Sequence, residues 1–260
     1  MAGWTFNEPW PNSAHGCIVD FYGLPKMAYY WVKQSMQMVD ISLSYSDLWQ
    51  QAGKPLQAHI WVDNEMEDGL TFSYSIEYFT PDGDIDLSEY TENGVNKAFV
   101  DASDHTMLGQ PCFVPPKSLV GKVLVARISA FSLSRKLLAT NDYHFAIVDT
   151  VAAIAQKTYV SGPLHPLLTV PKVDISIVGQ DTTFSVTVRS STVSALYAKP
   201  VLLNKRGTQL PYVVFKEAYV TIRPNTLMNF TIVEQGTKFD TASQFCVEAW
   251  NTDRTCIDYA

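Results

Sequence analysis

The chain has 260 residues, of which 47% are hydrophobic and 17% charged, so it can bury a core and is not disordered. Its net charge of −7 comes without a basic block, which argues against nucleic acid as a partner because phosphate binding needs clustered Lys and Arg. No apolar run approaches the roughly 18–20 residues that span a bilayer, and no signal-peptide pattern opens the chain. We therefore expect a soluble chain with no membrane partner, in a compartment that the sequence leaves unknown.

The N-terminal segment is dense in aromatic and proline residues. Residues 4–11 read WTFNEPWP, and residues 20–26 read DFYGLPK. Pro25 favours the start of a helix, because a proline in the first helical turn loses no hydrogen bond, and we expect that helix over Lys26–Gln37. Chain termini normally fray, so a terminus this apolar resembles the interior of a larger domain. We expect its surface to pack against the first sandwich described below, against a second copy or against a neighbouring molecule in a crystal.

From Val39 onward the hydrophobic period changes from helical to two, which is typical of strands. Residues 81–84, with sequence PDGD, predict a turn. Short alternating strands with turn signals between them predict an antiparallel sandwich. The expected strands are residues 39–45, 56–63, 71–79, 122–131 and 143–148.

A second change of character falls at residues 150–167, which are first Ala-rich and then punctuated by Ser161-Gly162-Pro163. We place a linker here, over residues 151–167. About seven strands in the following ninety residues fit an immunoglobulin-like sandwich. These strands are expected at residues 168–178, 183–189, 195–203, 219–223, 227–233, 244–250 and 255–259.

The four cysteines are Cys17, Cys112, Cys246 and Cys256, and none forms a C-x-x-C pair, so a zinc site is not expected. Cys246 and Cys256 flank a hairpin turn that we predict at residues 251–254. Counting outward from that turn pairs Cys256 with a residue near Ala249. We therefore expect buried thiols and no bridge.

Glu8 is the most tempting catalytic candidate, because many retaining glycosidases present their general acid/base in an Asn-Glu pair. That mechanism needs a second carboxylate about 5–5.5 Å away. The nearest acid, Asp20, sits in what we predict to be the next loop. We interpret Glu8 as a polar loop residue and predict no catalytic residue in this chain.

Metal chemistry has little support. Residues 82–89 alternate acids as a calcium loop does, but Leu87 stands where that loop requires Gly. Asp and Gly are also common in hairpin turns, so a turn explains these residues equally well. The five histidines are scattered without metal spacing. We expect no metal and no cofactor.

Exposed aromatic residues offer a binding function. Trp4 and Trp10 could stack on a sugar ring, or they could pack against the rest of a larger domain. The packing interpretation is favoured for Trp10, and both interpretations stay open for Trp4.

The order of the motifs resembles glycoside hydrolase family 2, in its β-mannosidase and exo-β-glucosaminidase branch. The first residues that carry the resemblance are Trp4, Asn7, Pro9, Trp10 and Pro11, then Asp20, Phe21, Tyr22, Gly23, Pro25, Lys26, Ala28, Tyr29 and Tyr30. Matches continue in the same order through Leu138, Ala139, Asn141 and Tyr143, and then through residues 207–211, 219–224 and 247–251. The matches spread over most of the chain.

The resemblance implies a fold and a domain order. The chain would be mainly β, with two immunoglobulin-like antiparallel β-sandwiches preceded by a strand-loop-helix remnant of a (β/α)8 barrel. The parts would be residues 1–37 for the barrel end, 38–150 for one sandwich, 151–167 for the linker and 168–260 for the other sandwich.

The resemblance also implies a function. The catalytic glutamates of the family lie on earlier barrel strands, so this chain would be the non-catalytic C-terminal region of a retaining exo-acting hydrolase of β-mannosides, β-glucosaminides or β-galactosides. Carbohydrate would be a partner through the parent enzyme. Trp4 would form a wall of the sugar pocket, and Asn7 and Trp10 match the motif as substrate-binding residues. The alternative is a free-standing carbohydrate- or protein-binding sandwich module, and self-association through residues 4–36 is a further expectation.

Overall fold

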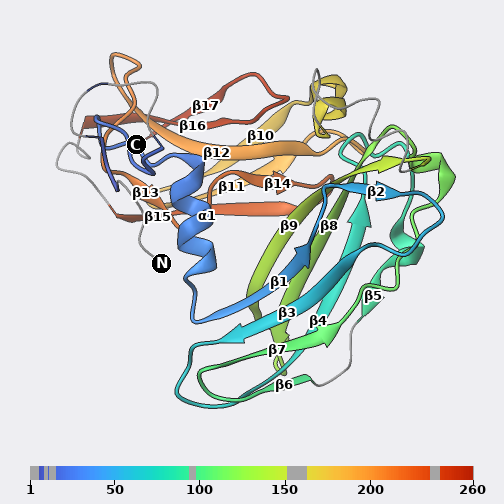
Figure 1. Ribbon diagram of the computed structural model, residues 1–260. Coiled ribbons are helices and arrows are strands. Elements are labelled where there is room, and N and C mark those ends of the chain that lie inside the picture. Colours follow the sequence, from blue (N-terminus) through green and yellow to red (C-terminus); the bar gives the residue numbers. More distant parts are fainter. Residues whose placement is uncertain are drawn as a thin grey trace. The chain divides into compact units, whose positions relative to one another are not determined.

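The computed structural model describes residues 6–8, 11, 16–93, 98–150, 163–234 and 241–259. These residues are mainly β, with seventeen strands, one α-helix and three short 3-10 helices among them. The chain divides into two compact units. The middle unit comprises residues 35–170, and the terminal unit combines residues 1–34 with residues 171–260. Figure 1 labels the elements of both.

The middle unit contains two sheets. One is antiparallel, in the order β1 (Val39–Tyr45), β3 (Ala58–Asn64), β7 (Asp104–Gly109). The other runs β2 (Trp49–Gln51), β9 (Leu137–Val148), β8 (Val123–Ser132), β4 (Leu70–Phe79), β5 (Glu92–Asn93), with β6 (Ala98–Val100) paired to β4. One core joins the two sheets, because Ile41 and Ile60 from the first are buried together with Phe72 and Phe145 from the second. The middle unit is therefore a sandwich, as the alternating pattern predicts.

The five predicted strands of this unit all form, with ends that differ by a few residues, most at β9, which starts at Leu137. The short strands β2, β5, β6 and β7 were not expected. One pair departs from the antiparallel expectation, since β2 pairs with β9 in parallel. The 3-10 helices η1 (Ser88–Tyr90) and η2 (Lys117–Leu119) lie in its loops. Of the predicted linker, residues 151–162 fall outside the described residues, and η3 (His165–Thr169) covers its end.

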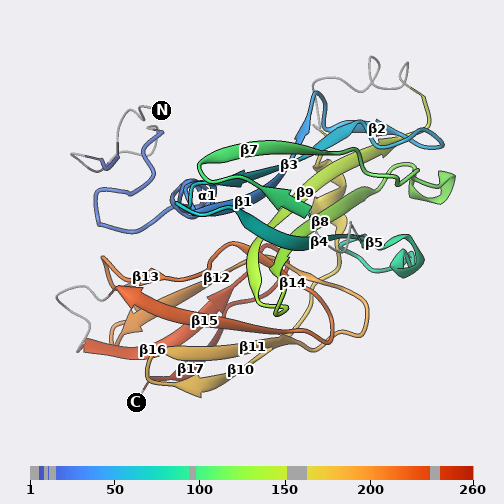
Figure 2. The same cartoon turned by 90° about the horizontal axis from the view of Figure 1, so that it is seen from below.

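The terminal unit holds a second sandwich of two four-stranded sheets. One is ordered β10 (Ile175–Gln180), β11 (Thr183–Val188), β15 (Leu227–Glu234), β13 (Val214–Phe215). The other is ordered β14 (Val220–Ile222), β12 (Ala195–Asn204), β16 (Ala242–Glu248), β17 (Thr255–Asp258). Figure 2 shows these strands from a second direction. Phe184 of β11 stacks on Phe245 of β16 with ring centroids 3.7 Å apart, so the two sheets share one core.

The N-terminal helix, α1 (Met27–Ser35), belongs to the terminal unit and lies beside β13 (Figure 1). Tyr30 is only 8% exposed and joins the core of the second sandwich. The Tyr30 hydroxyl accepts a hydrogen bond from Phe215 N–H at 3.4 Å, and Lys33 Nζ donates to the carbonyls of Phe215 and Lys216 at 3.2 and 3.0 Å. The expectation that this segment packs on the first sandwich is corrected here, since its buried face, at Tyr30, packs on the second sandwich. Self-association through residues 4–36 stays a prediction.

The cysteine expectation was wrong for one pair. Cys246 and Cys256 lie directly opposite each other on β16 and β17 and form a disulfide. The reason is the position of the turn: Thr252 N–H donates to the Ala249 carbonyl, so the turn is centred near Asn251, earlier in the chain than predicted. Cys17 and Cys112 are free, and of these only Cys17 is buried.

Within the described part of the chain, none of the helices has the length and apolar character that crossing a membrane requires.

Candidate functional site

The predicted substrate residues are only partly visible. Trp4 and Trp10 lie outside the described residues, so nothing is added to the prediction for either. Asn7 is exposed and forms a parallel bridge with Val19. Val19 also bridges Pro25, which brings three stretches of the N-terminal segment side by side. The substrate-binding role of Trp4, Asn7 and Trp10 stays a prediction.

Glu8 lies at the centre of a buried polar cluster with Cys17 and Lys26. Lys26 Nζ lies 2.8 Å from Glu8 Oε1 and 3.2 Å from Cys17 Sγ, and Cys17 Sγ donates to the same Glu8 oxygen at 2.7 Å. Glu8 is 4% exposed and Cys17 2% exposed. The hydrogen bond to Glu8 raises the pKa of Lys26. Burial, followed by the Glu8 hydrogen bond, raises the pKa of the Cys17 thiol.

This cluster suits a structural role for Glu8. An ammonium at hydrogen-bond distance stabilises the ionised carboxylate, whereas a glycosidase general acid must hold a proton. A cation, Lys26, and a thiol, Cys17, contact the Glu8 carboxylate, and neither can act as the second carboxylate of a retaining mechanism. Backbone bonds from Glu8 N–H to the Val19 carbonyl and from Lys26 N–H to the Ile18 carbonyl hold the cluster together.

A tight turn at residues 20–24 connects the segment to the second sandwich. Asp20 Oδ1 accepts hydrogen bonds from the N–H groups of Tyr22 and Leu24 at 2.9 and 2.8 Å. Gly23 has φ of +77°, a conformation that favours glycine. Its carbonyl accepts a bond from Tyr212 N–H at 2.9 Å, and the Tyr212 ring covers the position where a Cβ would stand.

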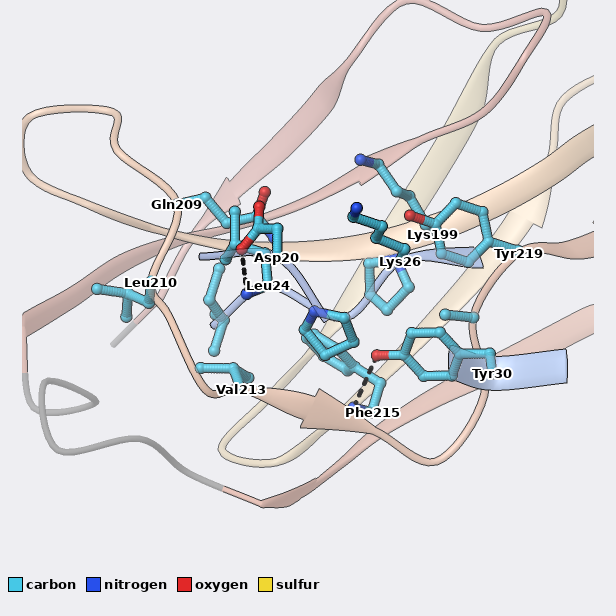
Figure 3. Close-up of a pocket in the computed structure, with 14 residues that line it drawn as sticks. Asp20, Leu24, Lys26, Tyr30, Lys199, Gln209, Leu210, Val213, Phe215 and Tyr219 are labelled. Atoms are coloured by element: carbon cyan, nitrogen blue, oxygen red, sulfur yellow. Dashed lines mark hydrogen bonds between the residues drawn. The ribbon is translucent and has the colours of Figure 1, made fainter. Parts of the chain in front are cut away.

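A cavity of about 190 Å3 lies within the terminal unit, between residues 20–30 and strand β12 with the loop that follows it (Figure 3). Its lining combines apolar side chains with several polar and charged ones. The apolar lining is Leu24, Pro25, Pro200, Leu202, Leu210, Val213, Phe215 and Ala218, and the polar lining is Asp20, Lys26, Tyr30, Lys199, Gln209 and Tyr219.

Lys199, one of the charged residues at the cavity, shares the carboxylate of Glu248 with Arg254. Lys199 Nζ lies 3.0 Å from Glu248 Oε2 and 5.9 Å from the centroid of the Tyr219 ring. Arg254 Nε donates to Glu248 Oε1 at 2.6 Å. Burial would raise the pKa of Glu248, but the bonds from Lys199 and Arg254 outweigh it and lower that pKa.

The tyrosines of the cavity are poor bases. Burial raises the pKa of Tyr30 to about 12 and also raises the pKa of Tyr219. Near neutral pH both remain phenols, which can donate or accept hydrogen bonds but do not take a proton from a substrate. Both tyrosines can therefore form hydrogen bonds with a ligand in the cavity.

The candidate calcium loop holds a lysine. Lys122 Nζ lies 3.1 Å from Asp82 Oδ2 and also contacts Asp84. Its ammonium thus takes the place between the carboxylates that a cation would need. Across the residues that the structure describes, no group of three or more His, Cys, Asp and Glu side chains is arranged to hold a metal ion.

No protein-family model matches the chain, and no curated protein matches it. Solved structures do match. The exo-chitosanase CsxA of Amycolatopsis orientalis, solved alone and with PNP-β-D-glucosamine, aligns at a TM-score of 0.71 with 17% identity. The chain shares its fold with part of an exo-chitosanase. The alignment covers 98% of this chain and 30% of the exo-chitosanase.

The β-D-mannosidase of Dictyoglomus thermophilum gives a similar result. It aligns at a TM-score of 0.60 with 16% identity, over 96% of this chain and 26% of the mannosidase. The chain therefore spans less than a third of the length of either neighbour. At these identities the likeness shows the fold, which is the mainly β, two-sandwich architecture that the sequence predicts.

Sequence reasoning missed the cavity. Asp20, Pro25 and Lys26 stand in the motif already singled out, but the opposite wall comes from residues 199–219. No periodicity or spacing relates two stretches that lie so far apart in the sequence. The aromatic side chains of the helix were the one signal in the sequence that pointed to this region, because an apolar helix face must pack against another surface.

Proposed function

We propose that the chain is the C-terminal region of a retaining exo-acting glycosidase of the family-2 type, acting on β-linked sugars. In this proposal two immunoglobulin-like sandwiches support a catalytic barrel and contribute no catalytic pair. One observation carries it: a single alignment runs through 98% of this chain, including its N-terminal segment, and takes up only 30% of an exo-chitosanase. The order of the sequence motifs along the chain supports the same assignment.

The contacts of the N-terminal segment support a buttressing role. Tyr30, Lys33 and Gly23 anchor residues 20–34 on the second sandwich through a buried ring, carbonyl contacts and a backbone bond. If residues 1–37 are the end of a barrel, these contacts fix that end to the last sandwich. The sandwich would then restrain the barrel's final strand and helix, at the edge where the family places its sugar pocket.

The sugar class is part of the proposal. One neighbour is an exo-chitosanase solved with a β-D-glucosamine derivative, and another is a β-D-mannosidase. Both names support a β-linked substrate for the parent enzyme. β-Mannosides, β-glucosaminides and β-galactosides are the three candidates, and Trp4, Asn7 and Trp10 are the residues of this chain that we propose for sugar contact.

The proposal predicts that the purified chain does not hydrolyse glycosides. We expect no nitrophenol release above the enzyme-free rate from PNP β-glucosaminide, β-mannoside or β-galactoside, because the proposal places the pair of catalytic carboxylates on earlier strands of the parent enzyme's barrel. The matched control is Glu8→Gln, which keeps the side-chain shape and removes the charge. Turnover by the wild-type chain that Glu8→Gln abolishes would contradict the proposal and would make Glu8 catalytic.

A further inference from the structure

We propose that the cavity of the terminal unit binds a small amphipathic carboxylate, an aryl or branched alkyl group that carries one carboxyl. This inference does not depend on the proposed function. It rests on an apolar floor of fitting size, on an ammonium at one end of the cavity and on a tyrosine held in a strained backbone conformation beside that ammonium.

The floor of the cavity is apolar. Leu202, Leu210 and Phe215 are each at most 3% exposed, and all belong to the core of the second sandwich. The cavity volume of about 190 Å3 is somewhat larger than the roughly 150 Å3 that holds benzene in an apolar protein cavity. An aromatic ring with a short acidic arm is therefore of suitable size, whereas a disaccharide is too large.

Lys199 provides the charge that selects an acid. Glu248 is shared between Lys199 and Arg254, so one carboxylate faces two cations and the group of three keeps a net positive charge. An ammonium has three donors, and the structure gives Lys199 Nζ one ion-pair partner, Glu248. Lys26, by contrast, is engaged by both Glu8 and Cys17. The ligand carboxylate is therefore assigned to Lys199.

The other end of the cavity fixes the orientation of the ligand. Figure 3 shows Asp20 near Gln209 and Lys199 near Tyr219. A negative charge at the Asp20 end repels an anion, and a positive charge at the Lys199 end attracts one. The carboxyl of the ligand then points to Lys199, and its apolar group lies over Leu202 and Phe215.

Tyr219 forms the aromatic wall next to Lys199. Its φ is +58°, a left-handed conformation that bulky residues rarely adopt and that clusters at ligand sites. Its ring lies 5.8 Å from the ring of Tyr30, with a tilt of 54°. A ligand ring can pack against these two faces, so the strain at Tyr219 positions a ring beside the ammonium.

Phenylacetate is the probe, and phenylacetamide is its neutral match. We expect titration of the 260-residue chain, followed by NMR shifts of residues 199–219, to give saturable phenylacetate binding with a dissociation constant of about 1 mM. The amide should bind about five-fold more weakly, because it lacks the charge-assisted bond. Lys199→Met should remove that difference, whereas Lys172→Met, which breaks an exposed ion pair of the same unit with Asp253, should preserve it.

Three outcomes would overturn the proposal: no saturable shift up to about 20 mM, equal affinity for acid and amide, or an unchanged preference in Lys199→Met. If Lys199→Met does not fold, the salt dependence of the wild-type chain replaces it. High salt should weaken binding of the acid and leave binding of the amide unchanged. Weakening of both to the same extent would count against an ion pair at Lys199.

Discussion

At the scale of single residues, Gly23 connects the N-terminal segment to the second sandwich through its contact with Tyr212. Its backbone is left-handed, with φ of +77°, and so is that of Tyr212, with φ of +56°. The two residues share a backbone hydrogen bond of 2.9 Å, and the Tyr212 ring lies against the glycine. A side chain at position 23 therefore meets two separate obstacles, the backbone conformation and the ring.

A comparison of Gly23→Ala with Gly207→Ala separates the cost of the left-handed backbone from the cost of displacing the Tyr212 ring. Gly207 has φ of +73°, but open space surrounds its Cβ position, so alanine there should cost about 1 kcal/mol of unfolding free energy. Alanine at Gly23 should cost about 2–4 kcal/mol, because the ring must also move. Urea unfolding of the terminal unit, followed by circular dichroism, measures both. Equal losses would mean that the Tyr212 ring yields without cost.

At the scale of elements, the strands with the cleanest alternation were the most predictable. Phe72, Ile76 and Tyr78 of β4 lie on one face of the strand and are all buried. Strands of two or three residues, such as β2 and β5, are too short to show an alternation of apolar and polar residues, so the sequence does not predict them. The register of β16 and β17 was missed because it depends on where the turn closes, and a shift of one residue moves every pair.

The candidate site was less predictable than the fold. Residues 20–26 could be marked as important from their composition, since Asp20, Gly23 and Pro25 are typical turn and helix-start residues. Their partners on β12 and in the following loop could not, because packing between distant segments leaves no local signal. Glu8 illustrates the difference: its motif suggested catalysis, and its surroundings give it an ion pair with Lys26.

The disulfide between Cys246 and Cys256 should stabilise the terminal unit alone. It closes a loop with a sequence separation of 10, for which the chain-entropy model gives about 2–3 kcal/mol. Cys256→Ser should lower the unfolding free energy of the terminal unit by that amount and leave the middle unit unchanged. The control is Cys112→Ser, an exposed free thiol, which should change stability by less than about 0.5 kcal/mol. Loss in the middle unit would contradict the assignment.

His144 on β9 should make the middle unit sensitive to acid. Burial lowers its pKa, Asp142 opposes this shift, and Arg127 adds to it. The folded chain then binds fewer protons than the unfolded chain below the ordinary pKa of about 6.5. The stability that this group contributes is present above that pH and is lost as the pH falls through it.

The measurement is the urea midpoint at pH 7.5 and at pH 5.5 for wild type, His144→Gln and the exposed control His165→Gln. We expect His144→Gln to reduce the fall in midpoint between the two pH values, and His165→Gln to leave it unchanged. Other titrating groups contribute equally to all three proteins, so the comparison isolates His144. An identical fall in all three would show that His144 is not the source.

At the scale of the whole molecule, the first residues of the chain belong with the last sandwich. Residues 1–34 and 171–260 form one unit, and residues 35–170 form another between them in sequence. Tyr30 contributes to the second core and Lys33 bonds to β13 and the next residue. The unit that would hold a barrel end is thus assembled from both ends of the chain. The contact of α1 with β13 is therefore the central structural claim.

Native-state hydrogen exchange under increasing urea tests that claim most directly. If α1 is part of the terminal unit, the slowest amides of residues 31–34 should open with the same free energy and urea dependence as those of β12 and β16. They should also be destabilised together by Gly23→Ala. Exchange of α1 by local fraying that urea does not change, or opening of α1 together with β4 and β8, would contradict the account.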